Sequence, residues 1–278
     1  MNIKFLGTGA AEGFPSVFCK CEYCVRAREL GVGEYRSRTQ VIIDGKMGID
    51  FPPDAYTNSL KHKVNLADLE YLLITHSHMD HFYAHDFILR GYKYAKFNGL
   101  PLKIYGNSEV KAVFDECTAR EMKPEVLKNF EFNVIKSYET FVIDGYRVIT
   151  IPANHSKTED ALLFYIEKEG KGYLHLHDSG LISDEALQFL ANQCAKAAAV
   201  AFDCTFIEHS AGATARHMGL GDNLVLKKKL LDLGVVNNKT KIIITHFSHN
   251  SNPLREHLNG IEHEYSVTAA YDGMVVNL

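Results

Sequence analysis

The chain contains 278 residues, of which 46% are hydrophobic and 23% are charged, and its formal net charge is −4. This composition is typical of a globular protein with a large core, and no apolar run reaches the roughly 20 residues that a membrane-spanning helix requires. The acidic balance argues against an extended nucleic-acid surface, which needs clustered Lys and Arg. The chain enters a strand at once and shows no signal-peptide pattern, so we expect a cytoplasmic location.

The first predicted strand, residues 3–6, leads into a glycine-rich turn at residues 7–13. This turn lacks the full spacing of a nucleotide-binding loop, and no helix clearly follows it. Two interpretations stay open. The turn cradles a phosphate, or its glycines allow a close backbone approach beneath a neighbouring site.

A compact cysteine cluster follows, because Cys19, Cys21 and Cys24 fall within six residues. Three thiols cannot form a simple disulfide pair, and in a reducing compartment this spacing predicts a structural zinc site. Zinc normally takes four ligands, so one more must come from elsewhere in the chain. The scattered cysteines are interpreted as small buried hydrophobic residues: Cys117, Cys194 and Cys204.

A hairpin is predicted for residues 39–50 and a helix for residues 52–60, which begins at two prolines. Asp50, at the end of the hairpin, could hydrogen-bond a metal-binding loop from behind. It could equally cap a helix or belong to an ordinary turn. Arg36 and Arg38 are interpreted as surface charges.

The most informative motif follows a short apolar strand and reads Thr-His-Ser-His-Met-Asp-His over residues 75–81. Because alternate residues of an extended segment share one side, His76, His78 and Asp80 can converge while His81 points elsewhere. Mixed imidazole and carboxylate ligands favour zinc, iron or manganese in a catalytic centre with open positions. The alternative is a surface loop that is rich in histidine by chance.

The middle of the chain is predicted to alternate helices and strands. Residues 83–97 are rich in aromatic residues and should form a helix near the mouth of the site, with His85 outside the metal site. A strand at residues 101–105 precedes a helix at residues 108–116, which its first residue, a serine, should cap. Residues 130–151 are predicted to form a three-stranded β-meander.

Three more predicted strands lead to residues that can bind a metal ion, namely His155, Asp178 and His246. If these strand ends meet at one rim of packed sheets, all three side chains lie close to the motif at residues 75–81. Asp178 is placed where one carboxylate could bridge two cations. Residues 242–246 also repeat the strand-to-histidine unit of residues 72–76, which suggests two related halves.

Other polar residues near these strand ends have competing interpretations. His175 and His177 alternate with leucines, so packing or support of the site is favoured over direct ligation. Lys157 could hold a substrate phosphate or be an exposed lysine. Asp203 is interpreted as a hydrogen-bonded structural carboxylate.

The remaining elements lie around a loop that contains His217, with His209 as a nearby competitor for any role. A polar residue that caps the next helix is the alternative for His217. The predicted elements are, in order, a helix that starts at residues 183–185 and ends near residue 195, a strand at residues 197–202, a helix at residues 222–233, and strands at residues 265–270 and 274–277.

Taken together, these motifs resemble the metallo-β-lactamase superfamily of dinuclear metallohydrolases. More narrowly, the chain is similar to the phosphoribosyl 1,2-cyclic phosphate phosphodiesterases of phosphonate breakdown, on residues 7–13, 19–24, 154–157, 216–218 and 245–249. The resemblance covers nearly the whole chain. It implies an α/β fold, an αββα sandwich of two packed sheets flanked by helices, as a single domain over residues 1–278.

The resemblance also implies roles for individual residues. His249 would complete the structural zinc site, the alternative being an exposed loop histidine, and His217 would be the proton donor. Two divalent ions, manganese or zinc, would occupy the catalytic centre. The implied ligands are His76, His78 and His155 for one ion, Asp80, His81 and His246 for the other, and Asp178 as the bridge.

The implied reaction is hydrolysis of a small cyclic phosphodiester, 5-phosphoribosyl 1,2-cyclic phosphate, by attack of a metal-bridging hydroxide. The expected partner is therefore a small phosphorylated sugar or a nucleotide-like substrate, without a membrane or extended nucleic acid, and the resemblance implies a homodimer. Two alternatives stay open. One is a related phosphodiesterase that acts on RNA 3′ ends, and the other is a non-catalytic carrier protein on the same fold.

Overall fold

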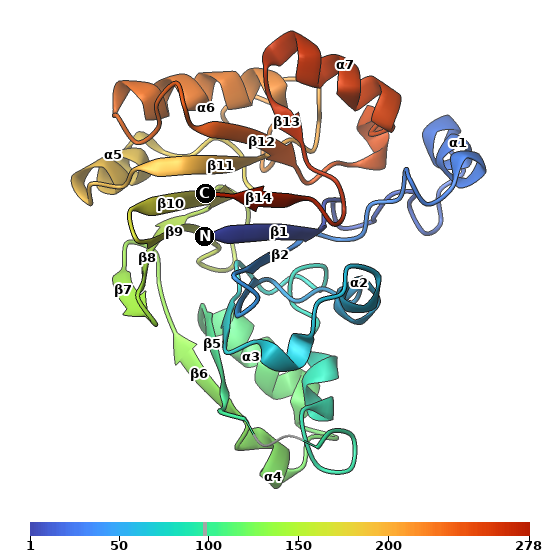
Figure 1. Cartoon of the computed structure of the whole chain (residues 1–278), viewed down its shortest axis with the longest axis vertical. Coiled ribbons are helices and arrows are strands. Elements are labelled where there is room, and N and C mark those ends of the chain that lie inside the picture. The colour runs from blue at the N-terminus through green and yellow to red at the C-terminus, as the bar shows by residue number, and fades with distance from the viewer. Residues whose placement is uncertain (97–98) are drawn as a thin grey trace.

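The computed structural model describes residues 1–96 and 99–278, which form two seven-stranded sheets packed face to face (Figure 1). The first sheet has the order β14 (Val275–Asn277), β1 (Asn2–Gly7), β2 (Gln40–Ile43), β3 (Met47–Ile49), β4 (Tyr71–Leu73), β5 (Leu102–Gly106) and β6 (Phe130–Val134). The second has the order β13 (Thr268–Ala269), β12 (Lys241–Thr245), β11 (Ala197–Asp203), β10 (Lys171–Leu176), β9 (Leu162–Lys168), β8 (Tyr146–Pro152) and β7 (Thr140–Ile143).

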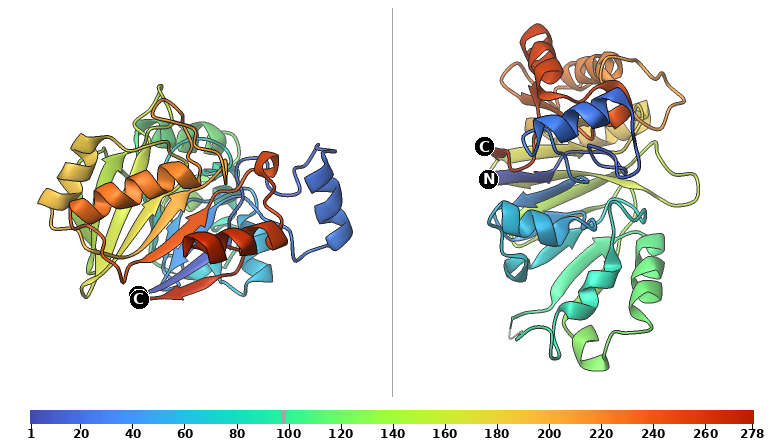
Figure 2. Two further views of the ribbon diagram at one scale, coloured as in Figure 1. Left: turned by 90° about the horizontal axis from the view of Figure 1, so that it is seen from above. Right: turned by 90° about the vertical axis from the view of Figure 1, so that its right-hand side faces the viewer.

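Helices cover the outer face of each sheet (Figures 1 and 2). The second sheet packs against α5 (Asp184–Asn192), α6 (Leu220–Asp232) and α7 (Arg255–Tyr265), and the first against α2 (Ala55–Lys61), the 3₁₀ helix η2 (Ala84–Leu89) and α3 (Ser108–Thr118). Smaller elements are α1 (Glu22–Leu30), which projects from the side of the sandwich, η1 (Leu66–Asp68), α4 (Pro124–Leu127) and η3 (His249–Ser251). None of the described helices is long and apolar enough to cross a bilayer.

The core consists of three apolar layers that alternate with the sheets and helices. Along β2, Val41 and Ile43 face the space between the sheets, whereas Ile42 faces the helices. A strand that is buried on both faces has apolar residues at every position. The alternation of its side chains between the two faces therefore does not appear in the sequence. The predicted αββα sandwich is therefore confirmed, and its single-domain organisation stays a prediction.

The predicted β-meander over residues 130–151 is wrong. β6 pairs in parallel with β5 at the edge of the first sheet, whereas β7 and β8 form an antiparallel pair in the second. The final two strands are also separated, since β13 pairs with β12 and β14 pairs with β1. Apolar alternation indicates a strand but does not say which sheet it joins, because the pairing depends on distant segments.

Several helix predictions also need correction. The helix expected at residues 83–97 stops at Leu89, because Gly91 (φ 149°) and Tyr92 (φ 55°) leave the helical region; residue 97 lies outside the described residues. The cap of α3 is Asn107, whose side chain accepts a hydrogen bond from the Val110 N–H, rather than Ser108. The sequence interpretation missed α1 and α7, whose short apolar stripes are interrupted by charged residues.

The glycine-rich turn after β1 allows a close backbone approach. A Cβ on Gly7 would lie 1.9 Å from the carbonyl oxygen of Arg38, so only glycine fits. The turn also bonds to the segment after β12, since the Phe247 N–H donates to the Thr8 carbonyl and the Ala10 N–H donates to the Phe247 carbonyl, both at 3.0 Å. These contacts favour the packing interpretation of the turn and place the N-terminal loop beside His246.

Arg36 is buried, so its interpretation as a surface charge is wrong. Its guanidinium donates to the Thr8 hydroxyl at 3.0 Å, to the Ala270 carbonyl at 2.6 Å and to the Pro253 carbonyl at 3.3 Å. Burial lowers the pKa of Arg36 to about 10, which still leaves it charged at neutral pH. One side chain thus joins the N-terminal loop to two segments near the end of the chain.

We expect Arg36→Met to lower the free energy of unfolding by about 3 kcal/mol, because it leaves buried carbonyl oxygens without a donor. Urea denaturation of the metal-loaded protein measures the change. Arg26→Met is the matched control, since Arg26 is exposed and, within the part of the chain that the structure describes, pairs only with Glu29 one helical turn away. Equal stability of the two variants would contradict the proposed role of Arg36.

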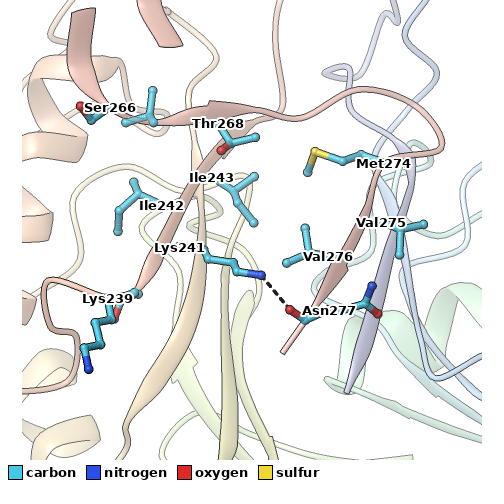
Figure 3. A pocket seen from close by; sticks show the side chains of 12 residues that line it. Lys239, Lys241, Ile242, Ile243, Ser266, Thr268, Met274, Val275, Val276 and Asn277 are labelled. Carbon is cyan, nitrogen blue, oxygen red and sulfur yellow. Dashed lines mark hydrogen bonds between the residues drawn. The ribbon is translucent and has the colours of Figure 1, made fainter. Parts of the chain in front are cut away.

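A surface hollow of about 570 Å³ lies where both sheets end, between β12, β13 and β14 (Figure 3). Its lining combines apolar side chains such as Ile243 and Val276 with Lys239 and Lys241, and the Lys241 ammonium donates to the Asn277 carbonyl at 2.7 Å. The hollow lies at the start of β12, whereas His246 follows its end. It is therefore distinct from the strand ends that hold the predicted site residues.

Candidate metal centre

The predicted ligand residues converge at one edge of the sandwich. β10, β11 and β12 are parallel, and β8 runs in the same direction, so their carboxyl ends meet at one edge. The loop after β4 reaches this edge from the facing sheet. Asp50, Asp178 and His246 have positive φ angles of 63°, 54° and 63°. Such backbone conformations are costly for residues other than glycine and often occur at functional sites.

Three overlapping groups of side chains share Asp178, and the ligand atoms within each group lie within 4.8 Å of one another. The first two groups are His76, His78, His155 and Asp178, and Asp80, His81, Asp178 and His246; the third is Asp178, Asp203, His217 and His246. Within the first two groups, His78 is exposed and the other members are buried, so the first group faces solvent. The structure thus brings together all seven predicted side chains, in the division that the resemblance implies.

Several buried atoms in these groups have no hydrogen-bond partner among the described residues. Asp178 Oδ1 lies 3.1 Å from His155 Nδ1, yet neither atom makes a hydrogen bond. The Nε2 atoms of His81 and His246 are also unpartnered, although His81 Nε2 lies 3.1 Å from Asp178 Oδ2. Because buried polar atoms rarely stay unsatisfied, convergent nitrogen and oxygen atoms of this kind fit a shared cation.

The centre also has an excess of buried negative charge. Four carboxylates are at most 7% exposed, those of Asp50, Asp80, Asp178 and Asp203. Within the described residues, every ion-pair partner of these carboxylates is a histidine. Uncompensated buried carboxylates are costly, so the centre requires positive charge from elsewhere. Divalent cations bound by neutral imidazoles would supply it.

The pKa shifts agree with this charge distribution. Burial lowers the pKa of His76 and lowers that of His155 to about 4, so both rings are neutral and able to bind a cation. Burial also opposes charge in the second group, but the carboxylates of Asp80 and Asp50 prevail and raise the pKa of His81. His81 in turn holds the pKa of Asp80 below its usual value against the effect of burial.

Two similar hydrogen-bond units orient the ligand rings. Asp50 Oδ2 accepts from His81 Nδ1 at 2.7 Å and from the hydroxyl of Thr75 at 3.0 Å, and that hydroxyl lies 3.0 Å from His76 Nδ1. Occupying Nδ1 leaves Nε2 free to face the centre. Of the three roles considered for Asp50, support of the metal-binding loop is therefore the one that the structure favours.

The second unit belongs to the other sheet. Asp203 Oδ2 lies 3.1 Å from the Thr205 hydroxyl, which lies 2.9 Å from His246 Nδ1. Each sheet thus contributes a buried aspartate, a threonine and a histidine, but the threonine of the second unit is Thr205 and not Thr245 of the repeated Thr-His unit. Asp203 also accepts from the Thr205 and Met218 N–H groups, in agreement with its interpretation as a structural carboxylate. Thr205 was not singled out in the sequence because it follows no local motif.

Replacing Asp50 by asparagine is expected to weaken metal affinity or activity by about 10- to 100-fold, the usual cost of losing a partner that orients a ligand. The amide can no longer accept from both Thr75 and His81 with full negative charge. Metal titration and steady-state rates measure the effect. Asp68→Asn is the control, because Asp68 is exposed and bonds only to Asn65. Unchanged metal affinity in Asp50→Asn would show that His81 keeps its orientation without the carboxylate.

His217 reaches the centre from the loop between β11 and α6. Its Nδ1 lies 3.0 Å from Asp178 Oδ1 and 3.3 Å from Asp203 Oδ2, and its side chain is 28% exposed. Burial would lower the pKa of His217, but these two carboxylates outweigh it and raise the pKa to about 10. A protonated ring beside an open metal centre suits a proton donor.

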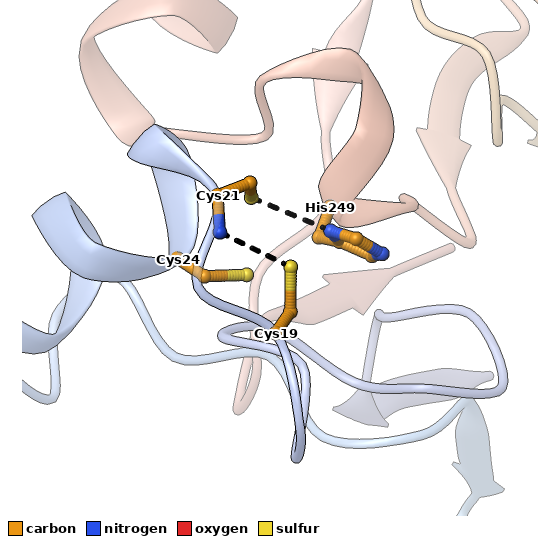
Figure 4. A group of neighbouring side chains, drawn as sticks. All are labelled: Cys19, Cys21, Cys24 and His249. Atoms are coloured by element: carbon orange, nitrogen blue, oxygen red, sulfur yellow. Dashed lines mark hydrogen bonds between the residues drawn. The ribbon is translucent and has the colours of Figure 1, made fainter.

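The three cysteines of the N-terminal loop meet His249, and their side chains point toward one another (Figure 4). Cys21 Sγ lies 3.6 Å from His249 Nδ1, and the N–H groups of Cys21 and Ser16 donate to Cys19 and Cys24 at 3.3 Å. Backbone hydrogen bonds of this kind stabilise thiolates. Burial raises the pKa of Cys24 to about 12, so a bound cation would be needed to keep it a thiolate. The donor set fits tetrahedral zinc.

Other candidates lie outside both clusters. His85 and His209 are exposed, as is Lys157 on the loop after His155. His175 and His177 are buried between the sheets, where His177 Nδ1 contacts the Thr39 hydroxyl at 3.2 Å, so their packing role agrees with the prediction. Of the cysteines expected to be buried, Cys194 is exposed and Cys117 only partly buried. That expectation holds for Cys204 alone.

Glu159 is a supporting residue that the sequence interpretation missed. Its carboxylate accepts from the Ser77 N–H at 3.0 Å, the Ser77 hydroxyl at 2.9 Å and the Asn107 amide at 2.9 Å. It thereby fixes the middle of the loop that carries His76 and His78. An isolated glutamate in a polar segment gives no sequence signal of this role.

The layered sheets and the convergent His and Asp side chains around Asp178 define an α/β protein with a candidate metal centre. Residues 42–247 match the model of the beta-lactamase superfamily domain, and the chain belongs to this family. No curated protein sequence matches the chain.

Solved structures with the same fold cover the whole chain. A diphosphatase from the PhnP family has a TM-score of 0.73 and 21% identity, over 99% of this chain and 96% of its own. Zinc-bound PqqB from Methylobacterium extorquens has a TM-score of 0.75 and 17% identity over 100% of both chains. The short form of human tRNase Z has a TM-score of 0.65 and 19% identity, over 100% of this chain and 99% of its own. At these identities the likeness shows the fold.

Proposed function

We propose that the protein is a dinuclear metal-dependent phosphodiesterase that hydrolyses a small cyclic phosphodiester. The observation that carries this proposal is the sharing of Asp178 by two groups of His and Asp side chains, in each of which the ligand atoms lie within 4.8 Å of one another. His76, His78 and His155 would hold one divalent ion, Asp80, His81 and His246 the other, and Asp178 would bridge them. Manganese or zinc suits this donor set.

Two divalent ions would supply Lewis acidity and lower the pKa of a bound water toward neutrality. The protein's own part is to hold the phosphodiester against the exposed His78 side and to provide the proton that the products need. As water attacks phosphorus and the bond from phosphorus to the sugar oxygen breaks, His217 gives its proton to that oxygen, and the proton of the attacking water passes to solvent. The products are a phosphomonoester and a free hydroxyl group.

We assign two further roles within the same proposal. Cys19, Cys21, Cys24 and His249 hold a structural zinc ion that fastens the N-terminal loop beside the catalytic centre. Lys157, exposed two residues after His155, is proposed to contact a phosphate of the substrate. A homodimer, implied by the sequence resemblance, is also proposed, and light scattering in solution tests it.

The proposed substrate is 5-phosphoribosyl 1,2-cyclic phosphate. The sequence motifs shared with phosphoribosyl cyclic phosphodiesterases support it, and so does the fold shared with a PhnP-family diphosphatase. The test compares initial rates of the zinc- or manganese-loaded protein on this compound, on a nitrophenyl diester and on pre-tRNA. We expect the cyclic ribose phosphate to be the best of the three.

The outcomes separate the alternatives. Faster cleavage of pre-tRNA would favour an RNA 3′-end phosphodiesterase, a possibility that the fold shared with tRNase Z keeps open and the net charge of −4 disfavours. No hydrolysis, together with a single zinc ion per chain held by the cysteines, would favour a non-catalytic carrier. Metal analysis of the purified protein therefore accompanies the rate measurements.

A further inference from the structure

The segment from Cys204 to Gly219, which carries His217, has no regular secondary structure between β11 and α6. Much of it is exposed, including Glu208, Ser210 and Arg216. A loop of this length and exposure needs specific fasteners to hold one side chain at a reaction centre. The question is which residues supply them.

The buried carboxylate of Asp222 fastens both ends of the exposed part of this loop. Its Oδ2 accepts from the Ala211 N–H at 2.7 Å and from the Gly219 N–H at 3.0 Å, and its Oδ1 accepts from the Gly212 N–H at 3.3 Å. Asp222 is 4% exposed, and no basic side chain among the described residues pairs with it. Its negative charge is satisfied by backbone N–H groups of the loop.

Asp222 accepts more hydrogen bonds than a residue that only caps a helix. An acidic residue in the first turn commonly accepts from the N-cap N–H, which here is that of Gly219. Asp222 accepts in addition from two residues that lie ten and eleven positions earlier in the chain. Those two bonds do not stabilise the helix. They hold the start of the loop against the start of α6.

The loop also packs tightly against the start of α6. A Cβ on Gly219 would lie 1.6 Å from the carbonyl oxygen of His209, so this position requires glycine. The Leu220 N–H donates to the Ile207 carbonyl at 2.6 Å and closes the base of the loop. The two ends of the exposed part of the loop are therefore held together, and the carboxylate of Asp222 accepts hydrogen bonds from backbone N–H groups at both ends.

His217 lies between the two segments that Asp222 holds. Ala211 and Gly212, whose N–H groups donate to Asp222, precede it in the chain. Gly219, whose N–H also donates to Asp222, follows it, and the intervening Met218 N–H donates to Asp203 Oδ1 at 2.9 Å. We propose that Asp222 is a positioning residue for proton transfer: it holds the loop of residues 211–219 so that the His217 ring stays at the metal centre. This inference rests on the proposed function, because it assigns a role to His217 as proton donor.

The experiment uses the dependence of the rate on the leaving group. A nitrophenolate leaves without protonation, whereas a sugar alkoxide needs a proton from the enzyme. The full-length metal-loaded protein and its Asp222→Asn variant are compared on a nitrophenyl diester and on a cyclic ribose phosphate. We expect the variant to lose about 30-fold in kcat on the cyclic phosphate and less than about threefold on the nitrophenyl ester.

Three further variants sharpen the test. Asp232→Asn, on the exposed side of the same helix and paired only with Lys228, should change neither rate. Asp222→Glu keeps an anionic acceptor and should restore part of the lost rate. In the His217→Ala background, Asp222→Asn should cause little further loss on the cyclic phosphate, because both changes remove the same proton transfer.

Two results would contradict the positioning role of Asp222, and a third would contradict the proposed function. Equal losses on both substrates, accompanied by a lower melting temperature, would reduce Asp222 to a structural residue and overturn the inference. Unchanged rates on both would do the same. If the metal-loaded wild type hydrolyses neither substrate, the proposed function itself fails, and that outcome is visible before any variant is compared.

Discussion

Replacing Asp178 by asparagine is expected to reduce the rate of phosphodiester hydrolysis by about 10⁴-fold, a loss typical of residues on which a whole catalytic unit depends. Asp178 is the only member common to both ligand groups. Its carboxylate faces five imidazoles within 3.9 Å: His76, His81, His155, His217 and His246. An amide of the same shape removes the negative charge that holds two cations together.

Metal content should change with the rate. We expect the metal content found by elemental analysis to fall from three ions per chain toward one, which would be the zinc ion proposed for the cysteine cluster. Asp184→Asn is the matched control, because Asp184 is exposed and pairs with Lys229 at the surface. If Asp178→Asn retained all its metal and more than about a tenth of the wild-type rate, the shared-carboxylate interpretation would be wrong.

The parts of the site that could be predicted from sequence follow local rules. Residues 75–81 combine ligands at alternating positions directly after a strand, and the cysteines are close together in the chain, so their convergence needs no knowledge of the fold. His155, Asp178 and His246 could be added because each follows an apolar strand. Parallel strands present their carboxyl ends at one edge, and the structure places all three there.

The parts that could not be predicted depend on contacts between distant segments. Nothing local distinguishes buried Arg36 from Arg38, which is only partly buried and pairs with Asp54. The acceptors of Arg36, the carbonyls of Pro253 and Ala270, lie more than 200 residues away in the chain. The roles of Glu159 and Asp222 also give no sequence signal, since each carboxylate accepts hydrogen bonds from backbone N–H groups of another segment. The sheet to which β6 belongs likewise depends on its pairing with β5.

Removing the proposed structural zinc by Cys21→Ser is expected to free the N-terminal loop without unfolding the sandwich. α1 projects from the side of the molecule (Figure 1). The apolar cluster at this helix contains, among the described residues, only Phe14, Cys24 and Ala27 as buried members. Structural zinc contributes about 10 to 16 kcal/mol of apparent binding free energy in small peptides, far more than so small a cluster can supply. We expect proteases to cleave residues 15–35 rapidly in the variant.

Activity should fall less than in Asp178→Asn, by about 10-fold, because the loop supports the centre without forming it. His249 follows His246 by three residues, and Glu12 accepts from the hydroxyl of Ser248 at 2.7 Å, so a released loop loosens the segment after β12. Cys194→Ser is the matched control, since Cys194 is exposed and outside the cluster. A Cys21→Ser protein that loses its third metal ion but keeps its resistance to proteolysis would show that the loop is fastened without zinc, and the two ions proposed for the catalytic centre should remain bound in either case.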